Sequence, residues 1–426
     1  MLITIEKVVY PGRRLAVQDG RTIFTDEGLP GERVEVELVR DHKSYLEART
    51  TRILIESPDR VPPRCGHYAA CSAYQPMTPE LQARVKTEQL GEILSRIGDL
   101  DAAAPDFVPA PDPWHYRNKA RFQVAWSGGR ASLAYHAAGS ATDLVPLREC
   151  HLVAPSVQAV LSAVLDVADR HGRHSLEGVE AKGSLATREL LLNLFWSAAP
   201  STNDLDPVLS EILPRFPVAG IISFHPERGR RVGVTEWGRD SIVEHVRGRA
   251  FEFGAASFFQ VHIAMLERIL AEIESVPGIS GARRIIDLYC GIGTFGIALA
   301  GGAETVEAVE SDPANVAFLK KNIARNRLDN VRIHEGRSEE WAPWLLEKPV
   351  DAVVCDPPRK GLDPAIVRSF LTFRPGRIVY LSCNPTTLAR DLKALRPLYA
   401  AEKITAFDVF PQTPHIETLT LLSRLR

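Results

Sequence analysis

The chain has 426 residues, of which 45% are apolar and 24% charged, so it is long and apolar enough to build two or three packed domains. Its formal net charge of −2 excludes a uniformly basic molecule, and any nucleic-acid-binding surface must therefore be a local patch. Six irregularly spaced cysteines, no leader sequence and no apolar run of membrane length favour a reducing cytoplasm over secretion or membrane insertion.

Residues 1–56 have the alternating pattern of a small all-β domain. Val34, Val36 and Leu38 alternate with glutamates, which predicts a strand with one buried face. Asp-Gly, Glu-Gly and Pro-Gly pairs mark turns between the apolar stretches. We expect a small barrel of about five strands, a shape that often binds nucleic acid. A purely stabilising module without a ligand is the plainer alternative.

Two cysteines and a helix follow the predicted barrel. Cys65 and Cys71 are spaced too widely for the usual pair of zinc ligands. The apolar residues of segment 78–97 recur with helical period, which predicts a helix. The Pro- and Asp-rich segment 104–113 is typical of a loop.

A basic stretch opens the middle of the chain. Arg117, Lys119 and Arg121 alternate along a predicted strand and would therefore share one face. That face could contact phosphates, or it could simply be a solvated, charged strand face.

Residues 120–250 are predicted to be a mixed α+β region. It contains a helix over 156–170 with Ser156 as its cap, and strands over 189–195 and 218–223. Further arginines there could add to a phosphate-binding surface: Arg228, Arg230, Arg231, Arg247 and Arg249.

From Phe251 onward, strands and helices alternate. Strands are expected at 284–288, 305–310, 331–334, 351–355 and 377–382, followed by a closing hairpin over 404–424. This alternation predicts an α/β fold with a parallel sheet and crossover helices. Ligands collect at the carboxyl ends of the strands in such a sheet.

The first of these strand ends indicates a nucleoside site. The loop DLYCGIGTFG (287–296) has a G-x-G turn, which is weaker than the full dinucleotide fingerprint. The next strand, VEAVESD, ends in Glu310, whose carboxylate can accept hydrogen bonds from both ribose hydroxyls. Because nothing there would hold a pyrophosphate, S-adenosylmethionine suits the site better than NAD.

Two later strand ends carry reactive side chains. VDAVVCDPPRKGL places Asp356 after a buried strand, between cofactor and substrate. IVYLSCNPTTLARD places Cys383 after another, just before a helix that Thr386 or Thr387 could cap. A thiol near a helix N-terminus is expected to have a lowered pKa and to attack as a nucleophile. An inert buried cysteine is the plainer alternative.

Five stretches together resemble the RNA (uracil-5-)-methyltransferases, which make 5-methyluridine in rRNA and tRNA. They are FFQVH (258–262), DLYCGIGTFG, DPPRKG, SCNPTTLARD and FPQTPHIE, in the order of the family. The resemblance implies a Rossmann-like methyltransferase domain with a seven-stranded sheet over 251–426. It also implies a TRAM-type RNA-binding barrel over 1–56, and between them, over 57–250, a cysteine segment with an α+β region for RNA recognition.

The resemblance also implies roles for single residues. Cys383 would add to carbon 6 of uracil, so that carbon 5 can take a methyl group, and Glu417 would then remove the carbon-5 proton. The cofactor-binding residues would be Gln260, Tyr289, Thr294, Glu310 and Asp356.

A 4Fe–4S cluster is the second cofactor that the resemblance raises. Members of the family carry Cys-x5-Cys-x2-Cys and a fourth cysteine downstream. Cys65, Cys71 and Cys150 match three of these positions, whereas Tyr74 stands at the other. Because such clusters normally have four thiolates, three alternatives stay open: another ligand such as Tyr74 or His67, a labile cluster, or a lost site.

Three other functions compete with uracil methylation. A cytosine-5 methyltransferase would carry a cysteine after Pro357, and an amino-group methyltransferase would carry an aromatic residue after the Pro-Pro pair, but Arg359 follows Pro358 here. An RNA-binding assembly factor without turnover would not need both Cys383 and Glu417.

We expect structured RNA to be the partner of a monomeric, cytoplasmic enzyme, with no role for DNA or a membrane. The barrel and the cluster-type cysteines favour 23S rRNA as the substrate. A uridine in the T-loop of tRNA is the alternative.

Overall fold

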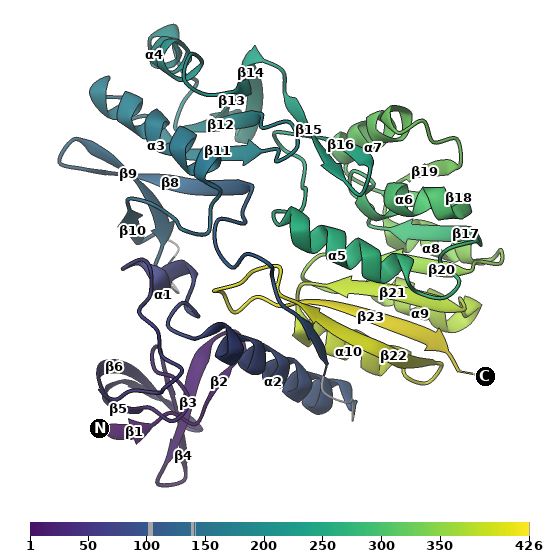
Figure 1. Cartoon of the computed structure of the whole chain (residues 1–426), viewed down its shortest axis with the longest axis horizontal. Helices are drawn as coiled ribbons and strands as arrows, with labels where there is room; N and C mark the ends of the chain where they lie inside the picture. Colours follow the sequence, from purple (N-terminus) through teal and green to yellow (C-terminus); the bar gives the residue numbers. More distant parts are fainter. Residues whose placement is uncertain (101–104, 138–139, 141, 426) are drawn as a thin grey trace.

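The structure is a computed structural model, and it describes residues 1–100, 105–137, 140 and 142–425 (Figure 1). Within these ranges the strands form sheets of six, seven, two and eight members. No helix in the described ranges combines the length and apolar character needed to cross a membrane.

The N-terminal sheet curls around a small apolar core and runs in the order β1-β5-β6-β4-β3-β2. Val34 and Val36 are buried, as their alternation predicts, but Leu38 is 49% exposed because the β5–β6 hairpin extends beyond the core. The sheet has one strand more than the five predicted. Its members are β1 (Leu2–Thr4), β2 (Lys7–Val9), β3 (Arg13–Gln18), β4 (Arg21–Thr25), β5 (Arg33–Asp41) and β6 (Tyr45–Ile55).

Two helices and a short strand connect this sheet to the rest of the molecule: α1 (Tyr68–Cys71), α2 (Pro79–Gly98) and β7 (Asp106–Val108). The helix predicted over 78–97 is confirmed as α2, whose N-cap Thr78 accepts a hydrogen bond from the N–H of Leu81. The prediction of a loop over 104–113 is wrong at β7, which pairs with β22 and becomes the edge strand of the C-terminal sheet. Position 104 of that predicted loop lies outside the described residues.

The central sheet runs in the order β10-β9-β8-β11-β12-β13-β14, and two helices pack on one of its faces. The helix α3 begins at Pro155 after Ala154, so the predicted cap Ser156 is wrong: proline already occupies the first turn. The elements are β8 (Lys119–Ser127), β9 (Arg130–His136), β10 (Leu144–Leu147), α3 (Pro155–Arg170), β11 (Leu176–Gly183), β12 (Leu190–Trp196), α4 (Thr202–Ile212), β13 (Val218–Glu227) and β14 (Arg230–Gly238).

The C-terminal sheet has the order β19-β18-β17-β20-β21-β23-β22-β7, with helices on both faces (Figure 1). All five predicted strands and the closing hairpin are present, with parallel pairing up to β21 and antiparallel pairing in the hairpin. Its strands are β17 (Ala282–Leu288), β18 (Ala303–Glu310), β19 (Val331–Glu335), β20 (Ala352–Cys355), β21 (Arg377–Ser382), β22 (Tyr399–Phe407) and β23 (Glu417–Arg424).

The hairpin β15 (Ser241–Val246) and β16 (Arg249–Gly254) leads into this part of the chain. The helices α5 and α7 pack on one face together with α6, while α2 and α10 cover the other. The helices are α5 (Ile263–Glu274), α6 (Thr294–Leu299), α7 (Pro313–Arg325), α8 (Ser338–Leu346), α9 (Pro364–Phe373) and α10 (Pro385–Leu395), with a 3-10 turn at Ala300–Gly302.

Candidate active site

A cavity of about 660 Å³ opens where β17, β18, β20 and β21 end. It is lined by all seven residues for which the sequence predicts a catalytic or cofactor-binding role: Gln260, Tyr289, Thr294, Glu310, Asp356, Cys383 and Glu417. It is also lined by side chains to which no such role was given: Arg117, Phe258, Arg359, Phe410 and His415. The fold therefore brings segments that are far apart in the sequence to one space.

The glycine loop after β17 forms one wall of the cavity. Gly293 has φ +92°, and a Cβ on it would lie 2.5 Å from Leu319 Cδ1, so no larger residue fits there. Gly291 also has a positive φ, but a Cβ there would meet open space. The loop leads directly into α6 and leaves its backbone close to the cavity.

Glu310 joins this loop to the end of β18. One carboxylate oxygen accepts the N–H of Gly291 at 2.9 Å, and the other accepts those of Ser311 and Asp312. A carboxylate oxygen can accept more than one hydrogen bond, so Glu310 keeps acceptor capacity toward the cavity that it lines.

Two buried polar atoms near the loop have no hydrogen-bond partner among the described residues: the Tyr289 hydroxyl and Oδ1 of Asp287. Burial raises the pKa of Asp287 to about 8, reinforced by the charges of Asp356 and Glu310 and opposed by the N–H of Gly296. An incoming cation would favour ionisation of such carboxyls. The acceptor capacity of Glu310 and the carboxyl of Asp356, both of which line the cavity, fit S-adenosylmethionine, which carries ribose hydroxyls and a sulfonium.

The opposite wall is anchored to the central sheet. Lys182 on β11 is buried and donates hydrogen bonds to the carbonyl oxygens of Gly254, Ala255 and Ser257, at 2.6–2.9 Å. The main chain of Asn118 donates to Val261 at 3.1 Å. Between these two attachments lies the segment with Gln260 and with Phe258, whose side chain is 61% exposed.

Cys383 follows β21 and lines the cavity just before α10. Asn384 caps that helix by accepting the N–H of Thr386 at 3.1 Å, so the predicted threonine caps are wrong. The prediction that the pKa of the Cys383 thiol is lowered is also wrong. Burial and the charges of Glu417 and Asp356 raise the pKa of Cys383 to about 11, against a smaller opposing effect of Arg359.

The carboxyl groups beside Cys383 are themselves hard to ionise. Burial raises the pKa of Asp356 to about 7. Burial, and after it the charge of Asp356, raises the pKa of Glu417 well above its usual range, although Arg359 opposes the shift. Groups with pKa values moved toward neutrality in a cleft are suited to proton transfer.

Of the three basic residues predicted to share one strand face, Lys119 and Arg121 do so, since they alternate with buried residues along β8, whereas Arg117 lies before the strand. Arg117 precedes β8 and lines the cavity, whereas Lys119 lies 3.5 Å from Glu180. The guanidinium of Arg121 lies 3.9 Å from the centroid of the Phe195 ring. Only Arg117 therefore lines the cavity, because strand β8 begins at Lys119.

The cysteine segment does not fit a 4Fe–4S cluster. Tyr74 is fully buried and its hydroxyl donates to Gln89 at 3.1 Å, so it points into the protein core. Gln75 donates to Cys65, and Cys150 lies near the Tyr135 hydroxyl. The part of the chain that the structure describes contains no group of three or more Cys, His, Asp or Glu side chains placed to hold a metal ion, and this includes Cys65, Cys71 and Cys150.

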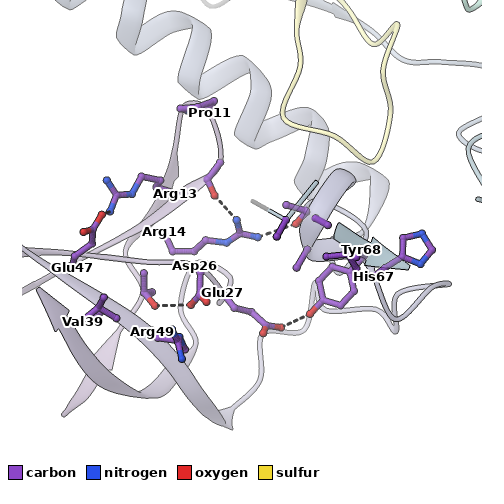
Figure 2. A pocket seen from close by; sticks show the side chains of 18 of the residues that line it. Pro11, Arg13, Arg14, Asp26, Glu27, Val39, Glu47, Arg49, His67 and Tyr68 are labelled. Atoms are coloured by element: carbon purple, nitrogen blue, oxygen red, sulfur yellow. Dashed lines mark hydrogen bonds and ion pairs between the residues drawn. The ribbon is translucent and has the colours of Figure 1, made fainter. Parts of the chain in front are cut away.

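A second cavity, of about 750 Å³, lies between the N-terminal sheet and α1 (Figure 2). His67, proposed as a substitute cluster ligand, lines this cavity. Acidic and basic side chains alternate there: Arg13 pairs with Glu47 at 2.7 Å, and the Tyr68 hydroxyl donates to Glu27 at 2.7 Å. Three arginines and three carboxylates line this cavity, and Arg13 with Glu47 is the ion pair formed between them among the described residues.

Comparisons with known proteins agree with this geometry. The tRNA (uracil-5-)-methyltransferase family matches residues 235–425. Uncharacterized RNA methyltransferases from Bacillus cereus (strain ATCC 10987) and Halalkalibacterium halodurans are 30% and 31% identical to the chain, and each match covers 99% of this chain and 96% of the relative.

A solved structure has the same fold. It is the tRNA (uracil-54, C5)-methyltransferase of Pyrococcus abyssi in complex with S-adenosyl-L-homocysteine, with a TM-score of 0.79 at 23% identity, covering 99% of this chain and 100% of that one. With its motifs gathered around one cavity and its relatives matched over almost their whole length, the chain belongs to the S-adenosylmethionine-dependent RNA (uracil-5-)-methyltransferase family.

Proposed function

We propose that the chain methylates carbon 5 of a uridine in structured RNA through a covalent bond between Cys383 and the uracil ring. The observation that carries this proposal is that Cys383, Glu417 and Asp356 line the same cavity as the glycine loop. A thiol and a base within one cavity are what the chemistry of carbon 5 needs, because this carbon is a weak nucleophile on its own. A catalytically silent RNA-binding factor would have no use for this pairing.

The proposed reaction begins at Cys383. Once its thiol proton has passed to solvent, Sγ forms a bond to carbon 6, and the electron pair of the 5,6 double bond moves toward the carbonyl at carbon 4. When bound, S-adenosylmethionine would supply the methyl group: carbon 5 would bond to the methyl carbon as the sulfur–methyl bond breaks, and S-adenosyl-L-homocysteine would leave. Glu417 then takes the proton from carbon 5, the double bond re-forms, and Sγ leaves carbon 6.

The other residues of the cavity bind the cofactor and orient the substrate. Glu310 and Tyr289 would bind the nucleoside part of the cofactor, with Thr294 and Gln260 on either side. Asp356 lies between the cofactor loop and Cys383, where it would orient the pyrimidine or the methionine end. Its buried carboxyl, with a pKa near 7, can also donate a hydrogen bond while protonated.

We propose a uridine of 23S rRNA as the first candidate substrate, because a curled N-terminal sheet is followed in the chain by cysteines at cluster-type positions. A T-loop uridine of tRNA is the second candidate, supported by the likeness to the Pyrococcus abyssi tRNA enzyme over the full chain. In this scheme residues 1–56 bind RNA, 57–250 recognise its shape and 251–426 catalyse, in a cytoplasmic monomer.

Mapping 5-methyluridine in RNA from a deletion strain tests the proposal. One 23S rRNA uridine should lose its methyl group and regain it when the wild-type gene, but not Cys383→Ala, is returned. Loss at tRNA position 54 would select the second candidate. Unchanged 5-methyluridine in both RNAs, together with no methyl transfer to bulk RNA in vitro, would contradict the proposed activity.

A further inference from the structure

The loop between β22 and β23, residues 408–416, leads directly into Glu417, the first residue of β23. Phe410, His415 and Glu417 all line the active-site cavity. At the middle of the loop, Gln412 has φ +68°, a left-handed conformation that a residue with a side chain adopts only when its surroundings enforce it. Hydrogen bonds within the loop, from Thr413 to the carbonyl oxygen of Phe410, support this shape, and contacts from α2 add to them.

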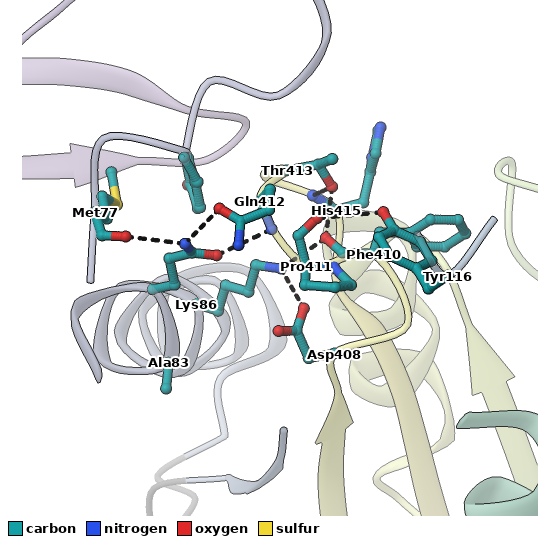
Figure 3. Close-up of polar contacts among 12 residues, drawn as sticks. Met77, Ala83, Lys86, Tyr116, Asp408, Phe410, Pro411, Gln412, Thr413 and His415 are labelled. Carbon is teal, nitrogen blue, oxygen red and sulfur yellow. Dashed lines mark hydrogen bonds and ion pairs between the residues drawn. The ribbon is translucent and has the colours of Figure 1, made fainter. Parts of the chain in front are cut away.

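Lys86 of α2 makes the first of these contacts (Figure 3). Its side chain is fully buried, and Nζ donates to Oδ1 of Asp408 at 2.6 Å and to the carbonyl oxygen of Phe410 at 3.1 Å. The two acceptors stand at the start of the loop and at a residue that lines the cavity. A buried ammonium without such partners would be strongly unfavourable, so the position of Lys86 and that of the loop depend on each other.

Gln82, one turn earlier on α2, holds the middle of the loop. Its side-chain oxygen accepts the N–H of Gln412 at 3.0 Å, and its amide nitrogen donates to the Gln412 side chain at 2.9 Å and to the carbonyl oxygen of Met77. The main chain of Tyr74 donates to the carbonyl oxygen of Gln412 at 3.1 Å. Both polar groups of the Gln412 backbone are thus bonded to the segment of chain around α2.

These polar contacts are not needed to attach α2 to the molecule. Leu90 and Leu94, further along the helix, are fully buried in the apolar core formed with α10 and β21. The helix is therefore anchored by packing, while its first half directs polar groups at the loop. The residues that attach α2 to the catalytic sheet are thus different from the residues of α2 that contact the loop.

We infer that Lys86 and Gln82 are positioning residues for the active site, holding loop 408–416 so that Glu417 faces Cys383. Both stand outside residues 235–425, the part of the chain matched by the family. The inference rests on the proposed role of Glu417 as the base. A displacement of the loop should slow removal of the carbon-5 proton while cofactor binding, which uses the loops after β17 and β18, stays intact.

The test uses the full-length double variant Lys86→Met/Asp408→Asn, because removing both charges avoids leaving an unpaired buried ion. The variant Gln82→Leu removes the second contact independently. Arg84→Met is the matched control: Arg84 is on the same helix, exposed, and paired with Asp59 rather than with the loop. Each variant is compared with wild type and with Glu417→Gln for kcat, KM for RNA, affinity for S-adenosyl-L-homocysteine, thermal midpoint, and the amount of denaturant-resistant RNA–protein adduct.

We expect kcat to fall at least about tenfold in the double variant and in Gln82→Leu, as misplacement of a reacting group does. KM for RNA and cofactor affinity should stay near wild type, adduct should accumulate, and Arg84→Met should behave as wild type. If Glu417→Gln accumulates adduct while both loop variants keep wild-type kcat and adduct levels, α2 is only a structural support and the inference is wrong. If Glu417→Gln itself turns over normally, the proposed role of Glu417 is wrong, whatever the α2 variants do.

Discussion

Cys383 and Glu417 lie opposite each other at one end of the paired strands β21 and β23. The neighbouring pair in the antiparallel register is Ser382 with Thr418. One is the first residue after β21 and the other the first residue of β23. The register therefore fixes a thiol and a carboxyl at the floor of one cavity, where the charge of Glu417 raises the pKa of Cys383. The predictions on catalysis follow from this pairing.

Substituting Cys383 with alanine should lower methyl transfer by at least about 1,000-fold, as removal of a nucleophile does in other enzymes. Binding of S-adenosyl-L-homocysteine, measured by calorimetry, should be unchanged because its contacts lie on other loops. Wild-type protein should form a gel-shifted, denaturant-resistant species with RNA containing 5-fluorouridine, since fluorine cannot leave as a proton. Normal turnover by Cys383→Ala would exclude the nucleophilic role.

The variant Glu417→Gln should form the covalent adduct but resolve it slowly. Addition and methyl transfer need no base at carbon 5, whereas elimination does, so turnover should fall about 100- to 10,000-fold. Adduct with ordinary RNA, which is transient in wild type, should become visible on a denaturing gel. No adduct together with an unchanged rate would exclude Glu417 as the base.

The reactivity of Cys383 should rise steeply with pH. Because burial, Glu417 and Asp356 raise its pKa to about 11, little thiolate is present at neutral pH. In Asp356→Asn a negative neighbour is lost, so the pKa should fall and alkylation at a given pH should be faster; in Arg359→Gln the reverse is expected. The rate of alkylation is measured by labelling the protein with iodoacetamide between pH 6 and 10 and quantifying the Cys383 peptide by mass spectrometry. Equal rates in wild type, Asp356→Asn and Arg359→Gln would contradict the prediction.

Protein purified without oxygen should contain no stoichiometric iron. Tyr74 replaces a thiolate and is hydrogen-bonded to Gln89 inside the core, where it cannot turn to a metal beside Cys65 and Cys71. Cys150→Ser should then be as stable as wild type in thermal unfolding. Brown protein with about four irons per chain, lost in Cys150→Ser, would show that a cluster forms with another ligand.

Glu32 should stabilise the N-terminal sheet except in acid. Burial opposes its ionisation, but hydrogen bonds from Arg60, Ser57 and Leu29 outweigh this and hold its pKa below the usual 4.5. A lowered folded-state pKa adds stability that is complete above the unfolded-state pKa and is lost as pH falls through the folded-state value.

Glu32→Gln should therefore lower the free energy of unfolding at pH 7 by about 2 kcal/mol, and the difference from wild type should shrink below about pH 4. The exposed neighbour Glu35 on β5 supplies the control variant, Glu35→Gln. Chemical denaturation at a series of pH values measures both. A difference independent of pH would mean that packing, not charge, accounts for the loss.

The sequence predicts the catalytic sheet and its cavity well because each strand is a local apolar run ending in a motif. Asp356 and Cys383 could be placed at strand ends without knowing what packs around them. The pKa of Cys383 could not be predicted, since the carboxyls that raise it reach the thiol only through the fold. The cap of α10 was missed because Asn384, threonines and Pro385 compete locally for the same position.

Lys86 was missed for a different reason. Along a helix, lysine is usually on the solvated face, and the apolar period of α2 gives no sign that this one is buried. Its partner Asp408 stands 322 positions later in the chain. Similarly, β7 has three residues, too few for a periodic pattern, and its strand conformation depends on pairing with β22.

The pairing of β7 with β22 also bears on how the protein is made. An unpaired sheet edge invites association with other chains, and translation exposes each segment in sequence order. Here β7 forms the edge strand beside β22 and α2 packs on one face of the catalytic sheet, and both leave the ribosome long before β22 and β23 do. When the last hairpin, β22–β23, is synthesised, the segment that pairs with β22 is therefore already available, and the edge of β22 need not stay unpaired.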